Sequence, residues 1–245
     1  MASGLSKAVS VLDAFSDGSP VLSAEQICAR NGYAMATGYR YIRDMCEAGL
    51  LVRLPQGYSP GPRIIEWDYM IRANDPLLRG SSDIVDGLVA DTQLELLLSQ
   101  LYGDRVVNVH YAHVEGNELL ELGRGRVMPL LRGSTSRAIV ANLSQRQLRR
   151  LYETHRDDRD ALAIGKDWKS FSAAMEKIRE QGWCVSSGEV HKDKTGVSAP
   201  IFVQGHVLGS LTLIGATARF RELKEAQVAR RVVDAARRIT DRISN

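Results

Sequence analysis

The sequence predicts an α+β protein of two domains, and three observations support this fold class. The length of 245 residues is enough for two hydrophobic cores. The composition, with 44% hydrophobic and 25% charged residues, is typical of globular proteins. The apolar pattern also changes along the chain, from short helices and a hairpin in the first 60 residues to mixed helices and strands beyond Asn74-Asp75-Pro76. We therefore place the domain boundary near residue 75.

The first two helices follow from local spacing and capping signals. Leu5, Val9, Leu12 and Phe15 recur at helical spacing and predict one apolar helix face, which the breaker run 17–20 then ends. Ser23 and Gln26 form a capping-box pattern that opens a second helix. Asn31-Gly32 is expected to end it, because glycine tolerates a left-handed backbone.

A third helix is predicted over residues 34–48, followed by a hairpin over residues 50–60 that turns at Pro55-Gln56-Gly57. One face of this helix is expected to pack inward, and it consists of Gly38, Tyr41, Ile42 and Met45. The other face is expected to point outward, and it consists of Met35, Ala36, Tyr39, Arg40 and Arg43. A helix of this length spans ~20 Å, which a DNA major groove can admit.

Charge alone does not establish a DNA-binding function. The net charge of the chain is +3, and the segment ending at Arg63 carries six basic and five acidic residues. An arginine on the surface of a three-helix unit is more often simply solvated than bound to DNA. The order helix, turn, helix and glycine-tipped hairpin raises the DNA hypothesis to about even with that alternative.

The remainder of the chain is expected to alternate between helices and strands. Residues 61–75 read as a connecting helix in which Pro62 sits in the first turn. Further helices are predicted over residues 75–103, 136–155, 168–182 and 222–243. Strands are predicted over residues 105–114, 118–125, 183–190, 196–203 and 206–215, with Gln204-Gly205 as a hairpin turn.

Both predicted domains resemble the IclR family of bacterial regulators. In the N-terminal part the matching residues are Leu22, Ser23, Gly32, Thr37, Tyr39-Arg40, Gly49-Leu50, Tyr58 and Gly61-Pro62-Arg63. In the C-terminal part they are Pro129, Ser134-Thr135-Ser136-Arg137, Gly182-Trp183, Gly188-Glu189, Ala199-Pro200 and Gly215. A resemblance that covers nearly the whole chain is more specific evidence for a family than a lone helix-turn-helix.

The resemblance implies an α+β architecture in three parts. These are a winged helix-turn-helix DNA-binding domain (residues 1–63), a linker helix (64–78) and a GAF-like α/β domain for effector binding and oligomerisation (79–245). Family members form dimers, often paired into tetramers. The DNA contacts implied for this chain come from Ala36, Thr37, Tyr39, Arg40, Arg43 and Arg53, where contacts to phosphate position the protein and contacts to base edges specify sequence.

The resemblance also implies a pocket for a small organic acid against the central sheet. The residues it nominates are Ser134, Thr135, Ser186, Glu189, Gly196, Thr212 and Ile214. Several family members carry an acid, a cysteine and a serine where this chain has Ser186, Gly196 and Ile214. We therefore expect a pocket that is roomier near Gly196 and more apolar near Ile214, suited to a larger or aromatic carboxylate. Structural roles remain open: Thr212 as a core residue, Gly196 as a bulge, and Glu189 as a partner of Arg137 or Lys192.

One residue departs from the family pattern. Gly38 lies inside the predicted third helix, where the family usually has a branched residue. Glycine costs a helix interior roughly 1 kcal/mol relative to alanine. Tyr41 is the residue we expect to fill the missing volume.

Enzyme and metal sites are weaker hypotheses. The sequence has no GxSxG, HExxH or P-loop motif. His110 and His113 fall on opposite faces of a predicted strand, which is poor geometry for zinc, and the three cysteines form no CxxC pair. We expect no cofactor other than the effector and no catalytic residue. The absence of a signal peptide or long apolar run predicts a cytoplasmic protein without membrane contact. A sensor that acts through protein partners instead of DNA is the remaining alternative.

Overall fold

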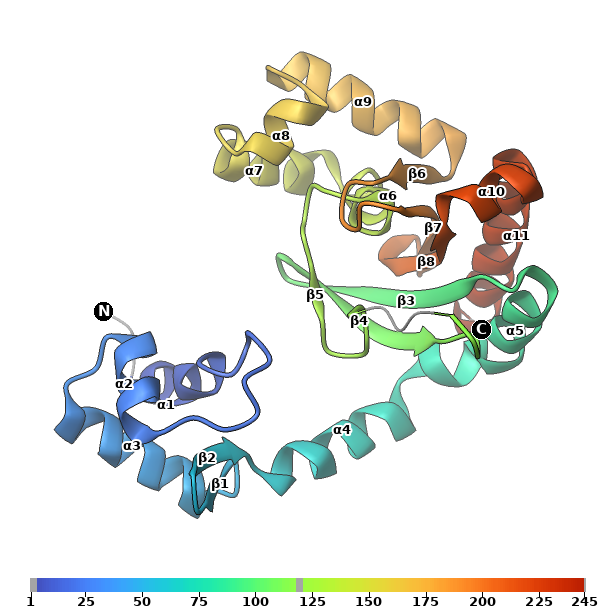
Figure 1. The fold of residues 1–245 in the computed structure, drawn as a ribbon. Coiled ribbons are helices and arrows are strands. Elements are labelled where there is room, and N and C mark those ends of the chain that lie inside the picture. The colour runs from blue at the N-terminus through green and yellow to red at the C-terminus, as the bar shows by residue number, and fades with distance from the viewer. Residues whose placement is uncertain (1–3, 118–120, 245) are drawn as a thin grey trace. The chain divides into compact units, whose positions relative to one another are not determined.

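The chain folds into two compact units, Met1–Asp75 and Pro76–Asn245. Figure 1 shows the computed structural model, which describes residues 4–117 and 121–244. The predicted linker, residues 64–78, spans the point where the chain passes from the first unit to the second. Each unit has its own hydrophobic core.

The first unit consists of helices and one hairpin. Its elements are α1 (Gly4–Asp13), α2 (Ala24–Asn31), α3 (Met35–Glu47), β1 (Leu51–Leu54), β2 (Gly57–Pro60) and α4 (Pro62–Asn74). The predicted capping box is present, since Ser23 Oγ accepts from Gln26 N–H and the Gln26 side chain accepts from Ser23 N–H. Gly32 ends α2 in a left-handed conformation, with φ of 67°. This confirms the sequence prediction for α2.

The apolar face predicted for the first helix is right for Leu12 and Phe15, which belong to the core of this unit, and wrong for Leu5 and Val9. Leu5 is 76% exposed and Val9 46% exposed, whereas Val11 is fully buried. Phe15 is buried, but it lies after the helix has ended at Asp13. Helical periodicity gave the correct element but not the centre of its buried face. That centre is Val11, which is the α1 residue that is fully buried in the core of this unit.

The hairpin is tied to the helices at two points. Leu22 and Tyr58 exchange backbone hydrogen bonds of 2.8 and 2.9 Å, which joins β2 to the residue before the α2 cap. At the other end Leu50 N–H donates to Met45 O of α3 at 2.9 Å, and Leu50 O accepts from Gly61 N–H. A Cβ at Gly57 would lie 2.4 Å from Leu22 O, so the hairpin approaches this closely only because residue 57 has no side chain.

The missing side chain at Gly38 is explained by Cys28, and the expectation that Tyr41 fills the space is wrong. A Cβ at Gly38 would lie 2.1 Å from Cys28 Sγ. Tyr41 instead packs edge to face with Tyr33, at 5.6 Å between ring centroids. The glycine therefore allows α2 and α3 to pack in close contact. The other residues predicted to face inward on α3, Tyr41, Ile42 and Met45, are buried as expected.

The second unit is built on a six-stranded sheet of order β5-β4-β3-β8-β7-β6, in which every neighbouring pair is antiparallel. The strands are β3 (Glu95–Tyr102), β4 (Arg105–Ala112), β5 (Val127–Met128), β6 (Cys184–Ser187), β7 (Lys194–Val203) and β8 (His206–Ala216). The helices are α5 (Pro76–Thr92), α6 (Ser134–Val140), α7 (Gln145–His155), α8 (Arg159–Ile164), α9 (Trp168–Gln181), α10 (Thr217–Leu223) and α11 (Glu225–Ser244).

The two faces of this sheet differ in chemistry. Leu96, Leu98, Val197, Leu211 and Leu213 pack with α5 and α11 into one apolar core. Because side chains alternate along a strand, the intervening residues face the other way, toward α6 (Figure 1). That opposite face carries Ser198, Ser210 and Thr212, which are buried hydroxyls. Only buried polar groups that find partners are tolerated, and here α6 supplies them.

The prediction of helix over residues 75–103 is wrong for its second half. The helix α5 ends at Thr92, Gln93 adopts a positive φ of 53°, and β3 begins at Glu95. The run from Leu96 to Leu98 is apolar on both faces because β3 is a central strand with cores on both sides. A continuous apolar run of this kind has no period that separates helix from strand.

Two further predictions are corrected. The strand expected over residues 118–125 is absent at 121–125, and residues 118–120 lie outside the described residues; the adjoining edge strand is β5 instead. The helix expected over residues 136–155 is two helices, α6 and α7, because Ser144 caps α7 in a second capping box with Gln147. The short helices α8 and α10 were not predicted. No helix in the described part of the chain is both long and apolar enough to cross a membrane.

The close contact at Gly38 predicts the effect of substitution there. We expect Gly38→Ala to destabilise the first unit by about 1–3 kcal/mol through overpacking, although alanine alone would favour the helix. The double variant Cys28→Ala/Gly38→Ala should recover most of the loss, because the sulfur is gone. Hydrogen exchange of α2 and α3 amides measures both. If the amides of Gly38→Ala exchanged more slowly than those of the wild type, the packing of Gly38 against Cys28 would be contradicted.

Candidate functional site

The outward face of α3 and the hairpin together form a groove of about 560 Å³. Its lining residues are Ala36, Tyr39, Arg40, Ile42, Arg43, Cys46, Arg53 and Tyr58. Five of the six residues predicted to contact DNA are therefore brought together, and the sixth, Thr37, is half-buried outside the groove lining. The sequence reasoning did not identify Tyr58, although it noted this residue as part of the family pattern.

The arginines along this groove differ in how much of their charge is available. Arg43 lies 3.5 Å from Asp44 and 3.8 Å from Glu47. Arg40 and Arg53 form no ion pair with any of the described residues, and the Arg40 guanidinium lies over the Tyr41 ring, 5.1 Å from its centroid. Arg40 and Arg53 thus offer unneutralised positive charge at the two sides of the groove.

The first turn of α3 presents amides without a side-chain cap. The residue at the cap is Ala34, which has no oxygen to accept from them. Nearby, Tyr39 Oη donates to Glu25 Oε1 at 3.1 Å, and this hydrogen bond raises the pKa of Tyr39. The hydrogen bond from Ser23 lowers the pKa of Glu25. Exposed amides at the start of a helix favour phosphate oxygens.

The second unit contains a cavity between the sheet, α6 and the segment joining β6 to β7. All seven residues nominated for an effector line it, namely Ser134, Thr135, Ser186, Glu189, Gly196, Thr212 and Ile214. The other lining residues are Leu97, Leu122, Met128, Gly133, Val190, His191 and Lys194. Sequence reasoning missed Leu97 because it assigned that segment to a helix. It considered Lys192, whereas Lys194 is the lysine at the cavity.

A chain of hydroxyl groups joins α6 to the sheet beneath this cavity. Ser198 Oγ donates to Ser134 Oγ at 2.9 Å and lies 2.8 Å from Thr212 Oγ1. Thr212 Oγ1 in turn lies 3.0 Å from Thr135 Oγ1. Ser210 Oγ donates to the carbonyl of Thr135 at 3.0 Å. Thr212 therefore has a structural role in this network as well as a position at the cavity.

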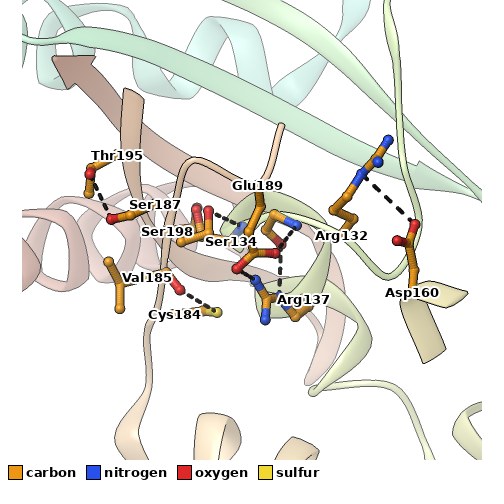
Figure 2. A network of polar contacts seen from close by, with 12 residues as sticks. Arg132, Ser134, Arg137, Asp160, Cys184, Val185, Ser187, Glu189, Thr195 and Ser198 are labelled. Atoms are coloured by element: carbon orange, nitrogen blue, oxygen red, sulfur yellow. Dashed lines mark hydrogen bonds and ion pairs between the residues drawn. The ribbon is translucent and has the colours of Figure 1, made fainter. Parts of the chain in front are cut away.

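Glu189 closes one side of the cavity through two contacts. Its Oε2 accepts from Gly133 N–H at 3.2 Å, and its Oε1 pairs with the Arg137 guanidinium. Figure 2 shows Glu189 directed toward Arg137, with Ser134 and Ser198 beside them. The next amide, Ser134 N–H, donates to Ser186 Oγ at 2.8 Å. The structural role considered for Glu189, a pairing with Arg137, is the one seen.

The cavity is smaller than the sequence suggested, with a volume of about 30 Å³. The expectation of extra room near Gly196 is wrong, because Ser134 takes up the space. A Cβ at Gly196 would lie 3.0 Å from Ser134 Oγ and 3.6 Å from Thr212 Cγ2. The expectation of an apolar wall at Ile214 agrees with the structure, in which Ile214 packs with Leu97 and Leu122.

The groups considered for metal or nucleophilic chemistry are engaged elsewhere. The described residues contain no cluster of three or more His, Cys, Asp or Glu side chains able to hold a metal ion. His113 Nδ1 lies 3.4 Å from Glu95 Oε1, a carboxylate that also accepts from Tyr111 Oη at 2.9 Å. Burial raises the pKa of the Cys184 thiol to about 11, so this thiol stays protonated near neutral pH.

Solved structures with the same fold cover almost the whole chain. A regulator of the IclR type from Alicyclobacillus acidocaldarius superimposes with a TM-score of 0.81 at 20% identity, covering 100% of both chains. An IclR homolog from Microbacterium hydrocarbonoxydans, solved in complex with 4-hydroxybenzoate, has a TM-score of 0.81 at 18% identity, covering 98% of this chain and 99% of its own.

Proteins that are similar in sequence are also named as regulators. The transcriptional regulator KipR of Bacillus subtilis is 22% identical, with 91% of this chain and 90% of the relative covered. The Pca regulon regulatory protein of Pseudomonas putida is 23% identical, with 85% and 72% covered. The family model for the IclR helix-turn-helix domain matches residues 4–55, and that for the C-terminal part of bacterial IclR regulators matches residues 73–241. The chain is thus a member of the IclR family of bacterial transcriptional regulators.

Proposed function

We propose that this chain is a ligand-responsive regulator that binds double-stranded DNA with its first unit and a small organic acid with its second. The observation that carries the proposal is the presence, in one chain, of Arg40 and Arg53 beside an open groove and of a cavity with apolar walls and polar groups in a separate unit. Such a protein acts by binding, in the cytoplasm where bacterial DNA lies, and not by catalysis.

The groove on the first unit has the properties that a DNA interface requires. Arg40 and Arg53 supply charge for phosphates, and the small side chain of Ala36 permits close approach of α3 to the base edges. Thr37 and Tyr39 add hydroxyl donors, although Tyr39 must break its hydrogen bond to Glu25 before its hydroxyl can donate to DNA. We assign Arg43 a weaker role because the carboxylates of Asp44 and Glu47 lie close to its guanidinium and partly neutralise its charge.

The cavity supports an acid effector with an apolar or aromatic body. Leu97, Leu122, Met128 and Ile214 give it apolar walls, and the donors Ser134, Lys194 and Arg137 lie in or beside it. The relatives named for the Pca regulon and the homolog bound to 4-hydroxybenzoate support an aromatic acid and a catabolic target operon for this chain.

Self-association is part of the proposal. The helix α4 buries none of its residues within the chain. It exposes large apolar side chains, including Ile65 and Tyr69 at 73% each and Met70 at 57%. Exposed apolar groups at this density mark interaction surfaces in soluble proteins. We propose that two copies associate through α4, as expected for a protein that reads a partly palindromic operator.

The DNA interface is tested with duplexes from the region upstream of the protein's own gene. We expect Arg40→Ala to weaken binding to every sequence and to lower the slope of log K against log salt by about one, since each neutralised phosphate contributes ~0.9. Arg156→Ala, at an exposed arginine of the second unit, is the control. A gel shift at two salt concentrations measures both. Wild-type protein indifferent to DNA at low salt would instead favour a sensor that acts through protein partners.

The effector cavity is tested by filling it. We expect Gly196→Val to weaken binding of 4-hydroxybenzoate by about tenfold or more, because its side chain would press on Ser134 and Thr212, which already occupy the space there, and would displace them from the cavity wall. Gly87→Ala, at a helical glycine with open space around it, is the matched control. Titration calorimetry measures both. Tight binding of pyruvate or glyoxylate with none of aromatic acids would refute the proposed ligand class.

The surface on α4 is tested by introducing charge. We expect Ile65→Glu to shift the protein toward the monomer, since a carboxylate in an apolar interface is costly to desolvate. Leu162→Glu, at an apolar residue of α8 that is 46% exposed, should leave the assembly unchanged. Light scattering on a sizing column gives the mass of each. Equal masses for all three proteins would exclude α4 from the interface.

A further inference from the structure

The cavity is too small for the ligand proposed above. Its volume of about 30 Å³ is room for about one water molecule, whereas cavities that hold benzene measure ~150 Å³. An aromatic acid therefore enters only when part of the wall moves. The part that moves is expected to be the one held by contacts that a ligand can replace.

Three parts of the wall are firmly held. The helix α6 is fastened to β7 and β8 by the hydroxyl chain from Ser134 to Thr135, and the strands are fixed by their ladders. The third part, Leu122 and Met128, is held by the Asn108 amide, which donates to Leu122 O at 2.8 Å, and by the pairing of β5 with β4.

The fourth part is the segment of residues 188–193 that joins β6 to β7. Its far end is held by Thr217 N–H, which donates to Asp193 O at 3.0 Å. Its near end begins at Gly188, whose N–H donates to Lys194 O at 2.9 Å, and between these two ends it is held by Glu189 and by Val190 against Gly133.

The contacts of Glu189 are those that a ligand carboxylate would make. One oxygen pairs with the Arg137 guanidinium and the other accepts from Gly133 N–H, both of which are charge-assisted hydrogen bonds. The side chain of Glu189 is 35% exposed, so it can leave for water without crossing the protein. That of Arg137 is only 17% exposed. A cation left unpaired in such a position is costly, so Glu189 is released readily only when another anion replaces it.

We infer that Glu189 is an internal competitor for the effector, and that an acid opens the cavity by replacing it on Arg137 and Gly133 N–H. This inference rests on the proposed function. Glu189 then sets how much binding energy any effector must supply to open the cavity, and Arg137 selects the acid, because a neutral molecule of the same shape can push the Glu189 side chain aside but cannot pair with Arg137. The released segment 188–193 then moves outward and provides the volume that an aromatic ring needs.

The test compares 4-hydroxybenzoate with its uncharged analogue 4-hydroxybenzamide, using the full chain. Glu189→Gln keeps the shape of the side chain and removes the competing charge. We expect it to bind the acid about tenfold more tightly than the wild type, because less of the protein is held in the closed form. The amide needs the same opening, so its affinity should rise by a similar factor while remaining weaker than that of the acid, which alone can pair with Arg137. Glu189→Ala is the second variant and should act in the same direction. Calorimetry gives both affinities, and thermal unfolding checks that each variant is folded.

Glu176→Gln is the matched control, since Glu176 also pairs with an arginine, Arg179 at 3.2 Å, but does not line the cavity. It should leave both affinities unchanged. If the Glu189 variants leave both affinities unchanged, or weaken the acid, Glu189 only shapes the loop or contacts the ligand itself, and the inference is wrong. An amide that binds the wild type as tightly as the acid would likewise refute the pairing of the effector with Arg137. If neither the wild type nor the variants bind any aromatic acid, the proposed effector class falls, and this inference with it.

Discussion

The second unit depends on a row of uncharged hydroxyl groups buried between a helix and a sheet. Ser134 and Thr135 on α6 meet Ser198 and Thr212 on the strands. An apolar face would have packed against α6 equally tightly, but without fixing its position along the strands. Paired hydroxyls fix that position, because each displaced partner would be left buried and unsatisfied. The cavity, its lining and the place of Arg137 all follow from where α6 is held.

The first unit was largely predictable because its signals are local. The capping box at Ser23, the left-handed Gly32 and the inward face of α3 depend on residues a few positions apart. The apolar face of α1 was not predictable in the same way. Which of its apolar residues is buried depends on how α1 meets α2 and α3, and Val11 meets them where Leu5 and Val9 do not.

The second unit was less predictable because its core is made by distant segments. The strand β3 has cores on both faces, so its leucines show no alternation and were taken for a helix. The seven nominated cavity residues came from family resemblance, and no spacing in the sequence would have brought Ser134, Ser186 and Thr212 together. The small volume of the cavity was also beyond sequence reasoning, since it results from where the Ser134 hydroxyl lies beside Gly196 and from how Glu189 holds residues 188–193.

The two ties on the hairpin have a consequence for how regulation can work. Leu22 holds one strand to the start of α2, and Leu50 holds the residue after the hairpin to the end of α3. The helix α3 and the hairpin therefore form one rigid DNA-binding unit, whose own shape has little freedom to vary. If two copies associate as proposed, a signal that begins in the second unit alters recognition by changing the spacing of two such units along the duplex, and not the shape of either one.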